Sequence, residues 1–436
     1  MAHVLIVTLA LTCVAVPWSL GQRLGVLRLF SPLHLLAYFA AGGFLAKVLV
    51  FAIWPDRAFY RRFDIAPEAL IWGALYLAAF VMFCCLGYVL ACGRVRKGRE
   101  ALPLAALPVQ ERFLLFLIAA SVTAAVAFPL IAARPEASLT ETLIALNSAK
   151  QVDPNAAGVG ATYAGLKSLF IVPKFAFVFF LAIAARRGLL RDWAYATVIG
   201  VLLVGIAVIS GDRFELLELL LYTGITWVMV RGRASFRASL RFVGCVLIAI
   251  AAATVMTRWR GVESLWWQIV GSTYFLDINV AVMVVAKVAP EHLLWGQSYG
   301  WWSFGWVPRA LWAEKPATDL GVYLKQVVMA QPGGGAFNVT GPGEAFINFG
   351  WVGMLVGLPL GALFRWGEVA TCGRGAGPAS ALMYPLLVYP FVQAALQSSI
   401  SAFLVTAAVQ WVMIFALSRI FVLRSAPRQS FAGQPA

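Results

Sequence analysis

The sequence predicts an all-α polytopic membrane protein of about eleven transmembrane helices. Its composition and the lengths of its apolar runs carry that prediction. Hydrophobic residues make up 61% of the 436 residues and charged residues only 12%, against about 25% charged residues in soluble domains. The mean hydropathy is +0.84. No polar stretch is long enough to form a separate core, so we expect residues 1–436 to form a single membrane domain.

Each predicted span is a mostly apolar run close to the length of about 20 residues that crosses the hydrocarbon core. The runs are 2–20, 33–54, 68–92, 113–133, 166–185, 193–209, 216–230, 242–257, 347–365, 379–396 and 402–423. The first run has no cationic segment before it, so we interpret it as a span and not as a cleaved signal peptide.

The basic residues predict the orientation of the spans. With the N-terminus outside, the short inside loops carry the larger share of Lys and Arg, as the positive-inside rule requires. Residues 424–436 then form an inside tail. Two lysines lie within spans. We expect Lys47 near the outer boundary, where its side chain can reach the headgroups. We expect Lys174, which follows Pro173, near mid-span and facing an internal cavity.

The composition also excludes several classes of partner. The net charge is +15, but the basic residues are scattered in short loops between spans, so we predict contact with membrane lipid and not with nucleic acid. The three histidines are far apart and show no metal-ligand spacing. No cysteine falls in a predicted outside loop, so no disulfide framework is implied. We therefore expect no metal site and no cofactor.

One long outside loop, 258–346, interrupts the regular pattern of spans. It is rich in tryptophan, a residue that favours the membrane interface, and includes Trp266, Trp267, Trp295, Trp301, Trp302, Trp306 and Trp312. We therefore predict that this loop lies against the outer leaflet as short interfacial helices, one of them near 262–288.

Several basic and glycine-rich features are predicted to share the outer face. They are Arg213 in the short turn 210–213, Arg258 and Arg260 after the eighth span, Arg309 and Lys315 within the loop, and Gly343 and Glu344 in the run 340–350. Guanidinium groups bind phosphate oxygens bidentately, and glycine-rich backbone can approach a phosphate closely. These residues therefore indicate a pyrophosphate-binding site, with Glu344 as a general base.

Each of these residues also has a structural interpretation. Arg213 can pair with Asp212 or with Glu215, which is followed by Glu218 on the next helix. Arginines after a span can be headgroup anchors, and Pro-flanked basic residues can belong to solvated turns. Glu344 can be an acidic residue at a helix N-terminus, where the helix dipole favours it. The structural interpretation weakens because all of these residues are predicted on one membrane face.

Three motifs in this region resemble those of the O-antigen polymerase (Wzy-like) family of oligosaccharide repeat-unit polymerases. They are the Ser-Gly-x-Arg turn at 210–213, the segment with Pro308, Arg309, Lys315 and Pro316, and the run Gly-Glu-x-Phe-x-Asn-Phe-Gly at 343–350. The resemblance covers the topology of most of the chain, but the motifs are confined to about 210–350. Asp212 stands where a serine is commoner in the family.

The resemblance implies a metal-independent glycosyltransferase with a GT-C-like architecture in the bacterial cytoplasmic membrane. Loop 258–346 and the N-terminus would be periplasmic, and the tail 424–436 cytoplasmic. The donor and the acceptor would be glycans on undecaprenyl pyrophosphate, and a chain-length regulator and a flippase would be partners. If the roles of the family motifs apply to this chain, Arg213 and Arg309 would hold the pyrophosphate, assisted by Arg258, Arg260 and Lys315.

Two other classes of membrane protein fit the same topology. An O-antigen ligase uses a similar donor, but such ligases place a histidine in the large outside loop, and His292 lies outside the arginine-rich and glycine-rich motifs. A flippase or secondary transporter is expected to show paired broken helices and internal repeats, and the sequence shows no repeat. A non-enzymatic assembly partner would not explain the arginines.

Overall fold

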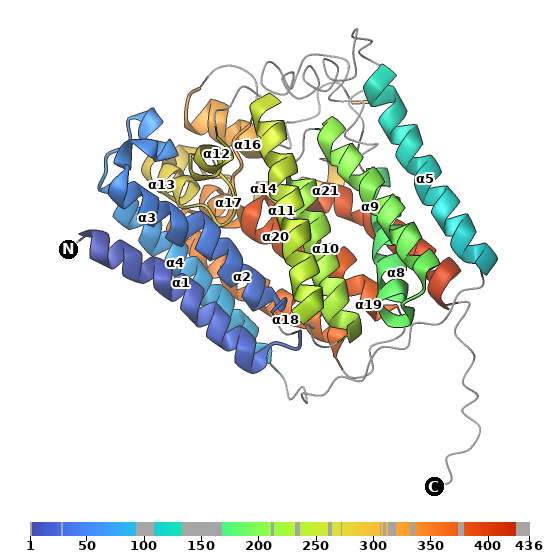
Figure 1. Ribbon diagram of the computed structural model, residues 1–436. Coiled ribbons are helices and arrows are strands. Elements are labelled where there is room, and N and C mark those ends of the chain that lie inside the picture. Colours follow the sequence, from blue (N-terminus) through green and yellow to red (C-terminus); the bar gives the residue numbers. More distant parts are fainter. Residues whose placement is uncertain are drawn as a thin grey trace.

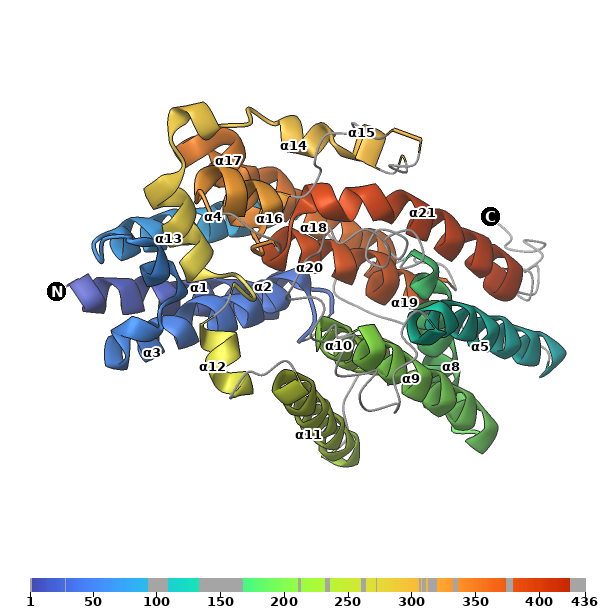
Figure 2. The ribbon, with the colours of Figure 1, turned by 90° about the horizontal axis from the view of Figure 1, so that it is seen from above.

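A computed structural model gives the structure of the chain. It describes residues 2–27, 29–92, 109–132, 168–210, 213–231, 236–259, 264–271, 273–305, 307, 311–312, 320–331, 336–373 and 379–423. Every regular element in these residues is a helix, which confirms the all-α prediction for this part of the chain. Helices α1–α4 lie at one side of the bundle and α5, α8 and α9 at the other, with α20 between them (Figures 1 and 2).

The N-terminal side of the bundle is built from long apolar helices. Its elements are α1 (Ala2–Leu24), α2 (Pro32–Ala40), a π-helical turn (Ala41–Leu45), α3 (Ala46–Ile53), 3-10 turns (Pro55–Arg57 and Phe59–Phe63) and α4 (Ala69–Leu90). Ser31 caps α2, because its side chain accepts a hydrogen bond from the backbone N–H of His34. Helices α2 and α3 form one candidate span, Pro32–Ile53.

The opposite side holds the helices that contribute most to the candidate site. Its elements are α5 (Val109–Ala132), a 3-10 turn (Ser168–Phe170), α8 (Ile171–Arg187), α9 (Leu190–Ser210), α10 (Arg213–Arg231) and α11 (Phe236–Trp259). A buried ion pair between Arg112 and Asp192, at 2.9 Å, joins α5 to α9. Charged residues inside a membrane bundle are stable only when paired in this way.

The C-terminal helices fill the space between the two sides. They are α17 (Gly341–Phe349), a 3-10 segment (Gly350–Val356), α18 (Gly357–Cys372), α19 (Ser380–Met383), a π turn (Tyr384–Val388), α20 (Tyr389–Gln397), α21 (Ile400–Ser418) and a π turn (Arg419–Leu423). A Cβ atom added at Gly361 would lie 1.9 Å from the carbonyl oxygen of Cys84. Helices α4 and α18 therefore pack backbone to backbone, as small residues permit in membranes.

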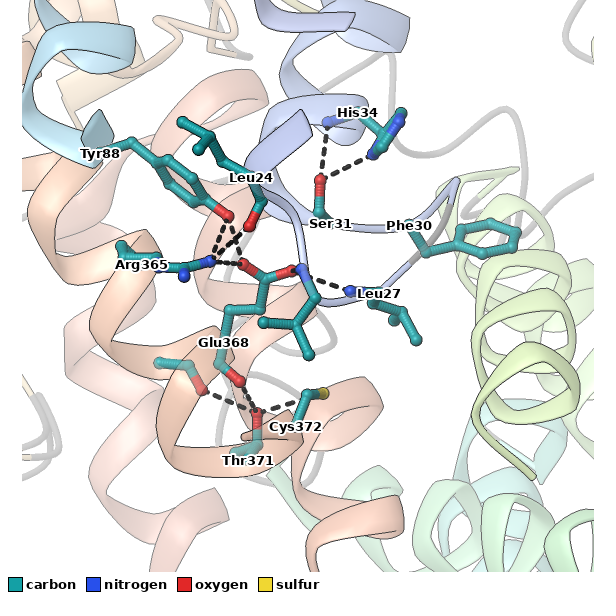
Figure 3. A network of polar contacts seen from close by, with 12 residues as sticks. Leu24, Leu27, Phe30, Ser31, His34, Tyr88, Arg365, Glu368, Thr371 and Cys372 are labelled. Atoms are coloured by element: carbon teal, nitrogen blue, oxygen red, sulfur yellow. Dashed lines mark hydrogen bonds and ion pairs between the residues drawn. The ribbon is translucent and has the colours of Figure 1, made fainter. Parts of the chain in front are cut away.

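A polar network ties α18 to α4 and to the turn between α1 and α2 (Figure 3). One carboxylate oxygen of Glu368 accepts the backbone N–H groups of Val26 (2.9 Å) and Leu27 (3.1 Å). The other accepts the hydroxyl of Tyr88 and, at 3.2 Å, the guanidinium of Arg365. The predicted span ended at residue 365, but α18 continues to Cys372 because this pairing allows two charged residues to be buried.

Among the described residues, fewer helices than the predicted number of about eleven have the length and apolarity of a span. In the described residues, eight helices are long and apolar enough to cross a membrane, or nine if the bent pair Ile278–Lys287 and Pro290–Gly300 is one span. The predicted spans 216–230, 242–257 and 379–396 are helical but do not meet both criteria. Helix α10 carries several charges, and the apolar stretch of α11 in the described residues is Gly244–Arg258, which is shorter than a span. The third predicted span corresponds to α19, a π turn and α20.

Residues 258–346, called here the outside segment after their predicted location, contain several short helices. They are α12 (Leu265–Val270), α13 (Ile278–Lys287), a 3-10 turn (Pro290–His292), α14 (Gln297–Gly300), α15 (Trp302–Gly305), α16 (Leu320–Tyr323) and a π turn (Leu324–Val328). The prediction of one interfacial helix near 262–288 is wrong. That stretch divides into α12 and α13, and residues 278–284 of α13 are all buried. Helix α13 packs against α4 and α17.

A buried ion pair anchors α13 in the bundle. Lys47 on α3 contacts Asp277, and both side chains are buried. Asp277 also caps α13 by accepting the backbone N–H of Asn279 at 2.7 Å, and the Asn279 side chain accepts the backbone N–H of Phe59 at 2.9 Å. The prediction that Lys47 reaches the outer boundary is therefore wrong, because its charge is paired inside the protein.

We expect Lys47→Met to lower the free energy of unfolding by about 3–5 kcal/mol, because it leaves the Asp277 carboxylate buried without its cation. Chemical or thermal unfolding in detergent measures the loss. Asp277→Asn keeps an oxygen that can cap α13, so the double variant should recover part of the loss. Strictly additive losses would show that the two side chains do not act as a pair.

Candidate active site

Four polar side chains of α8 and α10 form a cluster near the start of both helices. Lys174 lies in the first turn of α8, where the fixed φ of Pro173 is tolerated. Glu215, Glu218 and Tyr222 lie at spacings of three and four on α10, which places them on one helix face. The Lys174 ammonium is 2.8 Å from Glu215 and 2.5 Å from Glu218. The Tyr222 hydroxyl donates to the second oxygen of Glu218 at 2.6 Å.

This cluster lines a cavity of about 370 Å³ between α8, α10, α20 and α21. The other polar side chains of its lining are Gln393, Ser398, Thr406 and Gln410, and Phe170 and Phe403 supply aromatic rings. Lys174 and Glu218 are 14% exposed and Glu215 is 24% exposed, so a ligand can reach all three. The predicted cavity at Lys174 is therefore present, although Lys174 lies nearer the start of its span than the middle.

A second cavity, of about 440 Å³, adjoins the first. The two share Ser398 and Ala402, and the second is also lined by Asn338 and Val339 of the outside segment. Asn338 is fixed there, because its side-chain amide donates to the backbone carbonyl of Thr273 at 2.7 Å. The turn between α20 and α21 thus separates a cavity under the outside segment from the cavity with the charged cluster.

Glu344 holds this turn in place. Its carboxylate accepts the backbone N–H groups of Ile400 (2.6 Å) and Ser401 (3.2 Å), the first residues of α21, and the hydroxyl of Ser298 at 3.1 Å. Glu344 is fully buried. The N-terminal amides of a helix favour a negative charge, so the geometry gives Glu344 the role of a helix cap. Its role as a general base stays a prediction.

The run 340–350 packs tightly against neighbouring helices. Thr340 has φ 63° and ψ 157°, a backbone conformation that is essentially restricted to glycine and is strained in other residues. A Cβ atom added at Gly341 would lie 1.7 Å from the carbonyl oxygen of Ala395 on α20. Gly343 is buried, and its N–H donates to the Thr340 hydroxyl at 3.3 Å. Gly341 thus brings α17 against α20, and Gly343 brings it against Val280 of α13. A phosphate contact at Gly343 stays a prediction.

An apolar cavity of about 300 Å³ lies on another side of α10. It is lined by Leu216, Leu217 and Leu220 of α10 and by Val246, Ala249, Ile250 and Ala253 of α11. Glu215 and Glu218 face the polar cavity while these leucines face the apolar one. Helix α10 therefore separates a polar site from an apolar one over its first two turns.

The predicted basic residues are described only in part. Arg213 is the first residue of α10, two residues before Glu215, and its side chain lies outside the described atoms. Arg258 lies in the last turn of α11 and is exposed. Arg260, Arg309 and Lys315 lie outside the described residues, so the predicted arginine cluster stays a prediction.

The sequence predicted that Lys174 faces an internal cavity, and Glu215 and Glu218 were considered only beside Arg213. It did not predict that these three residues form one cluster. The signal was the burial cost of a lysine within a span, which requires a partner. The acidic pair on α10 at a spacing of three was the available candidate. The fourteen-residue lining of the cavity, which draws on four helices, had no local signal in the sequence.

We expect Glu344→Gln to lower the free energy of unfolding by about 1–3 kcal/mol, because the neutral amide is a weaker acceptor for the first amides of α21. Thermal unfolding in detergent measures the change. The matched control is Glu291→Gln, an exposed carboxylate on the outside segment, which should change stability by less than about 0.5 kcal/mol. Unchanged stability in Glu344→Gln would show that Glu344 is not a cap.

No protein-family model matches the chain, and searches of the curated proteins and of the solved structures found no match either. The sequence and the described helices together identify a polytopic, all-helical, multi-pass membrane protein.

Proposed function

We propose that the protein is a glycosyltransferase of the O-antigen polymerase family, which joins undecaprenyl-pyrophosphate-linked repeat units into a surface polysaccharide. One observation carries the proposal. Residues next to two motifs more than a hundred residues apart line adjoining cavities: Glu215, two residues after the turn 210–213, lines one, and Val339, directly before the run 340–350, lines the other. Polar sites inside membrane bundles are costly and are functional by default.

The two sides of α10 suit a substrate that is half sugar and half lipid. The polar cavity offers carboxylates, amides and hydroxyls to a sugar, whereas the apolar cavity between α10 and α11 offers leucine, valine and isoleucine side chains to a prenyl chain. Such a ligand has its phosphate groups between these two parts. Arg213 is the first residue of α10, and Arg258 lies in the last turn of α11. Both helices of the apolar cavity thus carry an arginine at the end predicted to be outside.

These arginines suit the chemistry of the proposed reaction. Pyrophosphate is a good leaving group, so the enzyme must chiefly align the reactants and stabilise the developing negative charge. Guanidinium groups can do both, and the proposal therefore needs no metal ion. Arg213 and Arg309 would hold the pyrophosphate, and Arg258, Arg260 and Lys315 would assist. The outside segment would then face the periplasm, with the N-terminus periplasmic and the C-terminus cytoplasmic.

The O-antigen ligase remains the second candidate, because it uses a similar donor. Neither of the two polar cavities has a histidine among its described lining residues. His292 lies on a 3-10 turn, where its ring nitrogen accepts the backbone N–H of Ala289 at 3.3 Å. This supports the polymerase over a ligase that depends on a histidine.

The test uses the purified full chain in nanodiscs with a panel of undecaprenyl-pyrophosphate-linked repeat units. We expect a ladder of products that differ by one repeat unit on a gel, and Arg213→Ala should slow its formation on the order of 10²-fold or more. The matched control is Arg187→Ala, an exposed arginine at the other end of α8, which should keep the wild-type rate.

Other results would redirect the proposal. Transfer to lipid A-core with no ladder would indicate a ligase. No turnover of any repeat unit in the panel would contradict both transferase hypotheses and favour a flippase or transporter. A ladder that Arg213→Ala leaves unchanged would support the polymerase and remove Arg213 from its site.

A further inference from the structure

The polar cavity contains a charged cluster that the motif resemblance leaves without a role. We propose that this cavity binds the acceptor sugar and that Glu215 accepts the proton of its attacking hydroxyl, with Lys174 as a positioning residue. This inference rests on the proposed function. In this inference Glu215 takes the place of Glu344 as the general base, because the Glu344 carboxylate already accepts hydrogen bonds from two backbone amides of α21 and from the Ser298 hydroxyl.

The lining of the cavity suits a sugar. Sugar hydroxyls need both donors and acceptors, and amide groups supply both. Gln393 and Gln410 bring amides from α20 and α21, and Thr406 brings a hydroxyl. The Phe170 and Phe403 rings provide apolar surface for the C–H faces of a sugar ring. The volume of about 370 Å³ falls near the lower end of pockets that bind small ligands, which begin at about 300 Å³.

A second observation is a buried hydroxyl beside the cluster that lacks a hydrogen-bond partner among the described residues. The Tyr389 hydroxyl is buried and has no hydrogen-bond partner among the described residues. The Tyr389 ring lies against the Tyr222 ring, with centroids 5.6 Å apart. Buried hydroxyls are normally paired. Tyr389 is not among the lining residues of the cavity, so its hydroxyl marks a place where a buried water beside the cluster can complete the network.

The geometry distinguishes Glu215 from Glu218. Glu215 is the more exposed of the two carboxylates, at 24% against 14%. Lys174 contacts one oxygen of each at 2.8 and 2.5 Å, so it fixes the two carboxylates relative to each other. Glu215 is therefore the carboxylate that an acceptor hydroxyl can reach.

The proposed step is a single displacement. The acceptor oxygen attacks the anomeric carbon of the donor glycan as its proton moves to Glu215. A carbon–oxygen glycosidic bond forms, and the bond from the anomeric carbon to the pyrophosphate oxygen breaks. The electron pair of that bond leaves with undecaprenyl pyrophosphate. The proton on Glu215 then passes to water, which restores the carboxylate for the next repeat unit.

The experiment measures kcat and KM for the lipid-linked repeat unit that gives a ladder with the wild-type chain. Glu215→Gln should lower kcat on the order of 10²–10⁴-fold, the usual contribution of a general base, with little change in KM. Glu215→Asp keeps the carboxylate and should keep more activity than Glu215→Gln. Glu218→Gln should lose less, and the matched control Glu291→Gln should keep the wild-type kcat.

Lys174 needs a measurement that separates positioning from folding. Lys174→Arg keeps a cation that can contact both carboxylates, and we expect it to restore most of the kcat that Lys174→Met loses. The unfolding temperature of each variant is measured beside its activity. Equal kcat in the Arg and Met variants, at equal unfolding temperature, would contradict the positioning role.

The outcomes separate this inference from the proposed function. A wild-type chain that makes no ladder contradicts the proposed function itself. A ladder that Glu215→Gln leaves at full rate contradicts only the inference, as does a larger loss in Glu218→Gln than in Glu215→Gln. Loss of the folded protein in both Glu215 variants, but not in Glu291→Gln, would identify Glu215 as a structural residue and also contradict it.

Discussion

The contact between the Glu344 carboxylate and the first amides of α21 determines where the two polar cavities meet. Helix α20 ends at Gln397 and α21 begins at Ile400, so the chain reverses at Ser398 and Ser399 within the protein. The amides of such a turn have no partner in lipid and must be satisfied by the protein itself. Glu344 satisfies them from α17, and so one contact joins the run 340–350 to the turn that both cavities share.

The same constraint explains why most of the buried charges in the described residues occur in pairs. Ion pairs join α3 to the start of α13 and α5 to α9, and a third lies within α18 and continues to Tyr88 on α4. Each is buried, and each either joins elements far apart in the chain or closes a helix end. The cluster of Lys174, Glu215 and Glu218 differs, because its side chains remain partly exposed to a cavity. That difference separates a candidate site from the structural pairs.

The sequence predicted the helices themselves, because apolar runs of membrane length have few alternative structures. It could not predict that α13 lies inside the bundle. A ten-residue apolar helix fits an interfacial position equally well, and its anchor pairs Lys47 with a residue 230 positions away. The site was predicted only as motifs and a buried lysine. The cavity joins four helices, and the contacts between them follow from packing rather than from any local pattern.

The charged residues near the start of α10 are explained by the two different cavities that this helix borders. A span that must present carboxylates on one face and leucines on another cannot be uniformly apolar, and α10 fails a simple length and hydropathy test for that reason. Glu215 and Glu218 are stable there because Lys174 lies on the facing helix, whereas Leu216 and Leu217 need no partner. A lipid-linked sugar has the same division between its two parts. The departure of α10 from an ordinary span is therefore itself an argument that the first turns of this helix contact the proposed substrate.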